Sequence, residues 1–509
     1  MLRYFKSKIW HSIIIIFSGA IATFAIPPIS IFVFIFALGF GIYLTTLNTS
    51  LKKTFISGWL LGFGWFSFGL FWIGSAFMVD ETYHKALMPF AIIILPSILA
   101  IFWGIACVFA KLFTKKNHTS IFLTIVCLTL FEYLRARLFT GFPWLMPSII
   151  LSPNEFLIQI FSFVGSFTAN LFVLTLSVLP FILISNFKHK YIIFTSLFIP
   201  VITLIFLSVV RFYNKDIKKI ENQLITLVQP NIEQKEKWRP ETRNINLKKL
   251  KQLSLQNALE FKDVNRIIIW PETSFEGSIP NEKSLLSRIS KQILINPKTI
   301  LVIGLLRVET NKLFNSLVFL NSNGNIIHQY DKIHLVPFGE YIPFRSNFGT
   351  IANFLNIKDF SSGKVKSNIT LKGFGEVLTL ICYEILFTEE VIARLSEDTN
   401  LLINITNDAW FGKTFGPYQH LSLAKIKAVE LGIPLARVAN TGISALISPY
   451  GKEITKIPLY ESGVKTVKSI VPLENTMYKK YGEIILIVSI LFLIIINKFG
   501  TCKYIRDQK

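Results

Sequence analysis

Three short polar motifs interrupt apolar, strand-like runs in the second half of this chain. Glu272 follows "IIIWP", Lys332 and Glu340 lie in "YDKIHLVPFGEYIP", and Cys382 and Glu384 lie in "LICYEILF". A cysteine attacks as a thiolate, so it requires a neighbouring base or cation. A carboxylate in a dry pocket can serve as the base because burial raises its pKa, and a buried lysine can stabilise an oxyanion. Cysteine, glutamate and lysine are therefore a sufficient set for acyl transfer through a thioester.

Histidine, the more common base, has no persuasive candidate here. The chain has 7 histidines, and those in the soluble-looking region are His328, His334 and His420. Each member of the reactive set also has an ordinary structural interpretation. A cysteine in an apolar strand is usually a small hydrophobic residue, a lysine beside Asp331 is by default a solvated charge, and glutamates hold turns and loops. Taken singly, none of these residues establishes an enzyme.

Residues 212–480 contain the elements that must position these side chains. Short β-branched runs such as "QLITLVQP", "TILVIGLL" and "NLLINITN" alternate with helix-like segments at 241–261 and 416–432. This alternation predicts a layered α/β domain, and the turn "NSNGNI" at 321–326 predicts a hairpin, so the sheet is not purely parallel. Rigid strands direct the side chains at their ends into the crevice beyond them, which is where the three motifs fall.

The composition predicts membrane spans. Of the 509 residues, 51% are hydrophobic and 47 are Phe, which is far more apolar than a soluble enzyme of this size. About eight apolar runs approach the ~20 residues that cross a bilayer. They lie at 11–27, 30–46, 55–78, 87–110, 119–134, 155–185, 191–210 and 482–497.

Three parts of the chain follow from this pattern. We expect an N-terminal membrane domain over 1–211, with about seven transmembrane helices. An α/β domain over 212–480 comes next, and a last transmembrane helix with a basic tail covers 481–509.

The positive charges predict the orientation. The net charge of +22 comes without a basic block with interleaved aromatic residues, which argues against a nucleic-acid partner. Lys and Arg instead flank the apolar runs, as Lys52 and Lys53 do after the second run. By the positive-inside rule, both termini are cytoplasmic and the α/β domain lies outside the cytoplasm. The 4 cysteines indicate no disulfide framework, and only Cys382 lies in the soluble-looking region.

The motifs "WPE", "DKIHLVPFGEYIP" and "CYE", in that order, resemble the nitrilase superfamily, whose catalytic triad is Glu, Lys and Cys. Four further motifs are similar to the apolipoprotein N-acyltransferases, the membrane-embedded branch of that superfamily. They are "LFTGFPWL" at 138–145, "VQPNIEQKEKW" at 228–238, "NITNDAWFG" at 404–412 and "RVANTGISALI" at 437–447. The resemblance covers essentially the whole chain.

Residue by residue, the resemblance implies that Cys382 is the nucleophile, Glu272 the general base and Lys332 the electrostatic stabiliser of the tetrahedral intermediate. By the same resemblance, the positions that support the site are Glu340, Glu384 and Tyr383. The positions that line the substrate are Trp238 and Trp410.

The resemblance also implies an αββα sandwich that faces the periplasm of a bacterial inner membrane. The expected reaction has two steps: the sn-1 acyl chain of a phospholipid, typically phosphatidylethanolamine, is taken as a cysteine thioester and passed to the N-terminal amine of a diacylglyceryl-modified apolipoprotein. This route needs no cofactor or metal, and no metal-ligand cluster or Gly-rich phosphate loop is present in the sequence. A monomer is the plain expectation.

Three rival functions remain open at this stage. A membrane-tethered nitrilase-type amidohydrolase would use the same triad but release the acyl group to water. A transporter or channel would carry charged or broken helices within the membrane, and Glu132, near one end of a span, could face a groove. A catalytically inactive lipid-binding scaffold is disfavoured by the complete triad.

Two local predictions remain to be tested. If the strand continues past Cys382, Glu384 points to the same face and could orient Lys332 or bind the incoming amine. In the segment 344–358, Phe348 and Phe354 lie on one helical face. This pattern fits a mobile lid over an acyl channel and a core-facing helix equally well.

Overall fold

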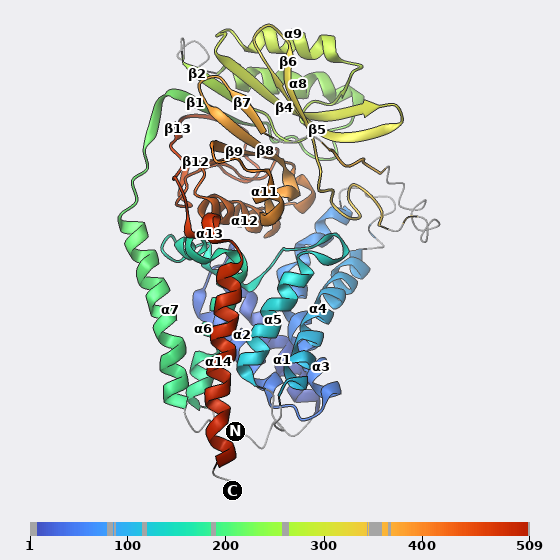
Figure 1. Ribbon diagram of the computed structural model, residues 1–509. Helices are drawn as coiled ribbons and strands as arrows, with labels where there is room; N and C mark the ends of the chain where they lie inside the picture. Colours follow the sequence, from blue (N-terminus) through green and yellow to red (C-terminus); the bar gives the residue numbers. More distant parts are fainter. Residues whose placement is uncertain are drawn as a thin grey trace. The chain divides into compact units, whose positions relative to one another are not determined.

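The computed structural model describes residues 8–78, 85, 88–114, 120–184, 190–256, 264–343, 345, 359–364 and 368–506, with side chains up to residue 497. The chain divides into two compact units (Figure 1). The helical unit comprises 1–74, 86–215 and 475–509, and the sheet unit comprises 75–85 and 216–474.

The helical unit is built from long apolar helices. They are α1 (Lys8–Ala22), α2 (Ile35–Thr46), α3 (Leu51–Gly69), α4 (Met88–Leu112), α5 (Ile121–Arg135), α6 (Ile160–Ile184), α7 (Lys190–Tyr213) and α14 (Ile484–Arg506), with the short helix α13 (Met477–Tyr481) before α14. Helix α3 packs against both α1 and α4. The approach to α4 is close, since a Cβ on Gly58 would lie 2.7 Å from Cys107 Sγ and 2.8 Å from the Trp103 carbonyl oxygen. A small residue lets the two backbones meet there.

Length and composition over the described residues do not confirm the predicted eight membrane spans. Three helical stretches qualify: Met88–Leu112, Leu157–Ile184 and Lys190–Tyr213. Counting α3 with the following 3₁₀ helix (Phe71–Met78) as one bent span makes up to 4. Other expected runs form shorter apolar helices, Ile9–Ala25, Phe32–Thr46 and Ile484–Asn497. The count of eight is therefore not confirmed: α2 and α5 have only 12 and 15 residues, and α14 continues to Arg506, beyond the residues whose side chains are described.

A buried ion pair lies inside the helical unit. Glu132 and Arg135 of α5 have side chains that are each 1% exposed. The indole Nε1 of Trp103 donates to Glu132 Oε1 at 2.8 Å, and the Arg135 guanidinium donates to the carbonyl oxygen of Phe142. The suggestion that Glu132 faces a groove is wrong, since its charge is compensated within the helix packing.

The sheet unit contains two mixed sheets. Its strands are β1 (Lys219–Gln229), β2 (Asn265–Ile269), β3 (Ser278–Ile279), β4 (Thr299–Glu309), β5 (Lys312–Leu320), β6 (Ile326–Asp331), β7 (Asn368–Leu371), β8 (Gly375–Ile381), β9 (Thr399–Thr406), β10 (Leu435–Ala439), β11 (Ser444–Ile447), β12 (Glu453–Ile457) and β13 (Gly463–Ile470). Among the described residues, the first sheet has the order β13-β1-β2-β4-β5-β6, with β3 beside β4. The second has the order β12-β11-β10-β9-β8-β7. The parallel pairs β1/β2 and β2/β4 lie in the first sheet, and the parallel pairs β8/β9 and β9/β10 in the second, so the carboxyl ends of β8 and β9 lie at the same edge of the second sheet.

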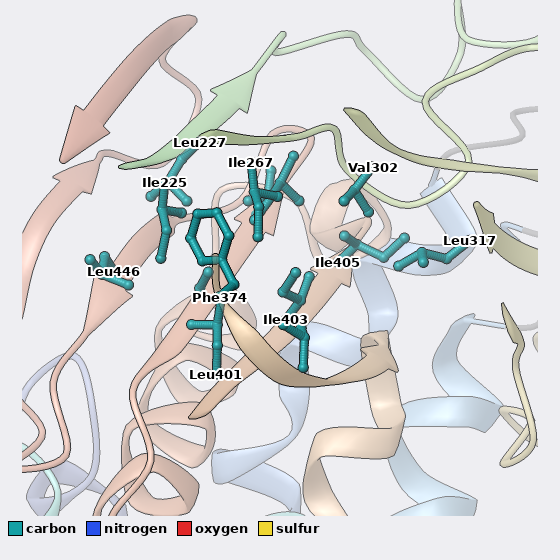
Figure 2. Packing of buried hydrophobic residues seen from close by; sticks show 14 of the residues in the cluster. Ile225, Leu227, Ile267, Val302, Leu317, Phe374, Leu401, Ile403, Ile405 and Leu446 are labelled. Carbon is teal, nitrogen blue, oxygen red and sulfur yellow. The ribbon is translucent and has the colours of Figure 1, made fainter. Parts of the chain in front are cut away.

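The main core lies between the two sheets (Figure 2). Ile225 of β1 and Ile267 of β2 pack from one side, and Leu401 and Ile403 of β9 pack from the other. A second core joins the outer face of the first sheet to helices α8 (Pro240–Leu255) and α9 (Lys283–Ile293). Helices α11 (Thr388–Arg394) and α12 (Gly416–Leu431) lie with the second sheet, and α12 contacts β10. The predicted αββα sandwich is confirmed.

Two local predictions within the sheet unit are also confirmed. The helix-like segments 241–261 and 416–432 correspond to α8 and α12, although α8 ends at Leu255, earlier than expected. The turn at 321–326 joins antiparallel strands β5 and β6, with the Gly324 amide donating to the Asn321 carbonyl. The proposed lid at 344–358 lies outside the described residues except for Arg345, which pairs with Asp359.

Candidate active site

Cys382 lies at a sharp change of backbone direction. Strand β8 ends at Ile381, and a 3₁₀ helix, η10 (Cys382–Leu386), begins at the cysteine itself. Cys382 has φ of 53°, a left-handed conformation that costs a non-glycine residue of order 1–3 kcal/mol. The strand therefore does not continue through "CYE", which corrects the assumption of extended geometry there. The turn leaves Cys382 partly exposed while its neighbours are buried.

Glu272 follows β2 in a tightly packed turn. Its side chain is buried, and both carboxylate oxygens accept hydrogen bonds: Oε1 from Asn315 Nδ2 at 2.7 Å, and Oε2 from the Asn407 amide at 2.7 Å. Gly304 of β4 makes the turn possible, because a Cβ there would lie 2.5 Å from the Pro271 carbonyl oxygen and 2.7 Å from Glu272 Cα. The carboxylate is thus held by the first sheet on one oxygen and by the loop after β9 on the other.

Lys332 directly follows β6 and is 1% exposed. Its ammonium lies 2.8 Å from Glu340 Oε2 and 3.8 Å from Glu272 Oε1. The Lys332 amide donates to the Asn315 carbonyl oxygen at 2.8 Å, which fixes the backbone from which the side chain extends. Lys332 therefore lies between two carboxylates and is closer to Glu340.

Asn315 of β5 is a site residue that the sequence interpretation missed. Its Nδ2 donates to Glu272 Oε1 at 2.7 Å and to Glu340 Oε1 at 2.8 Å, and its side chain is buried. One amide group thus bridges the two carboxylates that flank Lys332. The sequence offered one indication of this role. Asn315 is the polar residue that precedes the apolar run "SLVFL", on the strand that pairs with β6.

A second buried lysine was also missed. Lys237, in "EQKEKW", is 1% exposed and donates to the Glu272 carbonyl oxygen at 3.1 Å and to Thr273 Oγ1 at 2.6 Å. Burial lowers the pKa of Lys237 to about 8, although the charges of Glu272, Glu276 and Cys382 oppose the shift. Lys237 therefore stabilises the turn that presents Glu272.

The electrostatics of the triad favour a neutral thiol at rest. Burial, together with the negative charge of Glu272, raises the pKa of Cys382, and the positive charge of Lys332 only partly offsets this. Burial also raises the pKa of Glu272. For Lys332, burial alone would lower the pKa, but Glu340 and Glu272 outweigh it and raise the pKa above the ordinary value. Lys332 therefore stays charged. Because the pKa of Cys382 is raised even beside this charge, the thiol does not ionise spontaneously and needs a base.

Glu384 does not contact Lys332 as predicted. It is fully buried, and its Oε2 accepts from the Ile381 amide at 2.8 Å, while Oε1 accepts from the amides of Ile333 and His334 at 2.9 and 3.2 Å. Oε1 also accepts from Tyr330 Oη at 2.6 Å and lies 3.3 Å from the Arg394 guanidinium. The change from strand to 3₁₀ helix at Cys382 turns Glu384 into the protein, so it ties the backbone beside the cysteine to the backbone beside the lysine.

The aromatic residues differ in exposure. Tyr383 is buried, with its ring 5.0 Å from that of Phe387 and 5.8 Å from that of His334. Trp238 and Trp410 are 48% and 44% exposed. Trp238 is adjacent to Lys237 and Trp410 lies in the 3₁₀ helix that follows Asn407, so both are close in sequence to residues that hold Glu272. Within the described residues, no group of three or more His, Cys, Asp or Glu side chains is arranged to hold a metal ion.

Comparison with known families agrees with this fold. Residues 224–469 match the family model of carbon-nitrogen hydrolases, and residues 18–179 match that of the apolipoprotein N-acyltransferase N-terminal domain. The nitrilase-like prediction for the sheet unit is therefore confirmed.

Full-length relatives have the same combination. The chain is 30% identical to the apolipoprotein N-acyltransferase of Rhodopseudomonas palustris, over 96% of this chain and 95% of that protein. It is 31% identical to that of Allorhizobium ampelinum, over 92% of both chains. Among solved structures, an amidase from Nesterenkonia sp. is 18% identical and covers 54% of this chain and 98% of its own, with a TM-score of 0.37, too low to add to the family match.

Proposed function

Because this chain belongs to the apolipoprotein N-acyltransferase family, we propose that it transfers an acyl chain from a phospholipid to the N-terminal amine of a diacylglyceryl-modified apolipoprotein. The observation that carries this proposal is the charged cluster at Cys382. Lys332 lies 3.8 Å from Glu272, and both of their charges act on the thiol. A candidate base from the turn after β2 and a cation from the end of β6 thus both act on the candidate nucleophile at the end of β8.

The first half-reaction loads the enzyme. Glu272 takes the proton of the Cys382 thiol as Sγ attacks the sn-1 ester carbonyl, and the Lys332 ammonium donates to the resulting oxyanion. When the carbon–oxygen bond to glycerol breaks, Glu272 returns the proton to the departing glycerol oxygen. The products are a lysophospholipid and an acyl thioester on Cys382.

The second half-reaction transfers the chain. The apolipoprotein amine attacks the thioester carbonyl, Lys332 again stabilises the oxyanion, and Glu272 removes the amine proton. The carbon–sulfur bond then breaks, and the thiolate recovers a proton from Glu272. The net result is an amide and the starting enzyme, so no other reactant is needed.

The test is the intact mass of the full-length protein after incubation with phosphatidylethanolamine that carries an isotope-labelled sn-1 chain. We expect a label-dependent gain of one acyl group that is discharged by a diacylglyceryl lipopeptide. Cys382→Ala should abolish the gain, whereas Cys127→Ala, a control on helix α5, should retain it.

Water is the competing acceptor. A gain discharged equally fast without lipopeptide would indicate a tethered amidohydrolase with the same triad. No gain by a folded protein would favour a lipid-binding scaffold. The family match over both the N-terminal and the hydrolase regions favours the transferase.

For location, we propose a bacterial inner-membrane protein with cytoplasmic termini, a periplasmic sheet unit and a monomeric state. Lys456 of β12 has a 43% exposed side chain and suits a single-cysteine label. In spheroplasts, a membrane-impermeable maleimide should label Lys456→Cys without permeabilisation, in a background lacking Cys382 and Cys502. Labelling only after permeabilisation would show that the sheet unit lies in the cytoplasm, which contradicts the proposed orientation.

A further inference from the structure

A network of buried polar side chains reaches Cys382 separately from Glu272 and Lys332. Thr406, the last residue of β9, places Oγ1 3.2 Å from Cys382 Sγ and 2.9 Å from Asp408 Oδ1. Thr406 and Asp408 are both completely buried. They lie in "NITNDAWFG", a motif to which the mechanism above gives no role. A buried charge two residues from a contact of the reactive sulfur requires an explanation.

Asp408 is held as an anion. Its Oδ2 accepts from the Arg437 guanidinium at 2.7 Å, and its Oδ1 lies 2.9 Å from His420 Nδ1. Burial would raise the pKa of Asp408, but Arg437 and His420 outweigh burial and lower it. Burial and the Arg437 charge lower the pKa of His420, so its ring is neutral. Since an ionised carboxylate can only accept, His420 Nδ1 must carry the ring proton.

Thr406 has a single hydroxyl proton and two neighbours that can accept it. While Cys382 is a thiol, S–H can donate to Thr406 Oγ1 and the hydroxyl can donate to Asp408. When the sulfur is a thiolate, the hydroxyl can turn to it, and Asp408 Oδ1 keeps its bond from His420. Both Asp408 oxygens therefore remain paired in either state, Oδ1 with His420 and Oδ2 with Arg437. A hydrogen bond to the charged sulfur is stronger than one from the neutral thiol, so the exchange favours the thiolate.

We propose that Thr406 is a positioning residue for the nucleophile, accepting from the Cys382 thiol at rest and donating to the thiolate in both half-reactions. Asp408, which Arg437 and His420 hold in position, accepts the Thr406 hydroxyl while Cys382 is a thiol and releases it when Cys382 is a thiolate. The thiol proton still goes to Glu272, and Thr406 only rotates its own. The inference rests on Cys382 being the nucleophile, as in the proposed function.

Several groups act on the same sulfur, so the effect of Thr406 must be separated from theirs. The charges of Glu272 and Asp408 raise the pKa of Cys382, while that of Lys332 and the hydrogen bond from Thr406 lower it. Lys237 also interacts with the thiol charge. His420 interacts with the Cys382 backbone. Of these contributions, a Thr406 variant removes only the hydrogen bond.

The experiment measures the rate at which iodoacetamide modifies Cys382 in the full-length protein as a function of pH, read from the mass of the peptide containing Cys382. Thr406→Val removes the hydroxyl and nearly keeps the shape. It should move the midpoint of the profile upward by about one pH unit, the equivalent of one lost hydrogen bond to a charged group. Thr406→Ser should restore the wild-type midpoint. Thr379→Val, a buried threonine of β8, is the control and should not move it.

An unchanged midpoint in Thr406→Val would overturn the inference. So would a shift that Thr406→Ser fails to reverse, because that pattern indicates packing alone. If Thr406→Val does not fold, Thr406→Ala replaces it under the same expectation. Iodoacetamide requires no lipid, so a shifted midpoint combined with no acyl uptake would contradict the proposed function and leave the role of Thr406 standing.

Discussion

Glu384 and Ile333 are 51 positions apart in sequence, yet the Glu384 carboxylate accepts the Ile333 backbone amide at 2.9 Å. The same carboxylate accepts the amide of Ile381, the residue before the nucleophile. One buried side chain thus sets the spacing between the backbone after Lys332 and the backbone before Cys382. A change in either loop would be transmitted to the other through this carboxylate.

Glu384→Gln should therefore destabilise the sheet unit and slow thioester formation together. The substitution removes one of the two carboxylates that pair with Arg394, since Glu390 remains, and it replaces one oxygen that accepts backbone amides by a donor, which costs about 1–3 kcal/mol. Thermal unfolding of the purified protein measures the first effect and the acylation burst measures the second. Glu309→Gln, an exposed partner of Arg307, is the control and should change neither. Loss of the burst with unchanged stability would argue for a direct chemical role of Glu384.

Glu272→Gln should abolish rapid thioester formation while the protein stays folded. The amide keeps the size of the side chain but cannot take the thiol proton, and general base catalysis contributes roughly 10²–10⁴-fold. The measurement is the burst of labelled acyl uptake in rapid-quench samples. A burst of normal rate in this variant would rule out Glu272 as the base.

Asn315→Ala should shift the acidic limb of the burst-rate profile to higher pH. The Asn315 amide lowers the pKa of Glu272, so its removal lets burial raise that pKa further. The base must be ionised, and the rate rises as pH increases through the Glu272 pKa; a higher pKa moves this limb upward. Asn400→Ala, whose amide donates to Phe374 in the other sheet, is the matched control. A uniformly lower rate without a shift would mean that Asn315 acts only through packing.

The stability of the wild-type protein relative to Lys237→Met should increase as the pH rises from about 8 to 10.5. The pKa of Lys237 is about 8 in the folded protein against an ordinary value of 10.5, so between these values the unfolded chain binds more protons. Wild-type stability therefore increases with pH across this window relative to the variant, which has no proton to lose. The difference in melting temperature between variant and wild type, measured below pH 8 and above 10, tests the sign. A constant difference would show that Lys237 titrates normally.

The residue types that carry the chemistry could be predicted from the sequence. "WPE", "DKIHLVPFGEYIP" and "CYE" place Glu272, Lys332 and Cys382 directly after strand-like runs, and β2, β6 and β8 end where those runs end. The α/β layering, the hairpin at 321–326 and helix α12 followed from local periodicity and turn chemistry. These features depend on neighbouring residues, so a single sequence contains them.

The partners of those residues depended on the tertiary structure. Asn315 meets Glu272 across 43 positions because β5 pairs with both β4 and β6, and no local pattern marks that meeting. Glu384 was misassigned because β8 ends at Ile381 and the chain turns at the left-handed Cys382, instead of staying extended through Glu384. The predicted eight spans are not confirmed, because hydropathy does not show where a helix ends, as at Thr46 of α2 and Arg135 of α5. The sequence by itself determined which potentially reactive groups follow the strands, since residue type sets intrinsic chemistry. Only strand pairing and burial decided which charges and donors surround them, because those contacts join segments far apart in the chain.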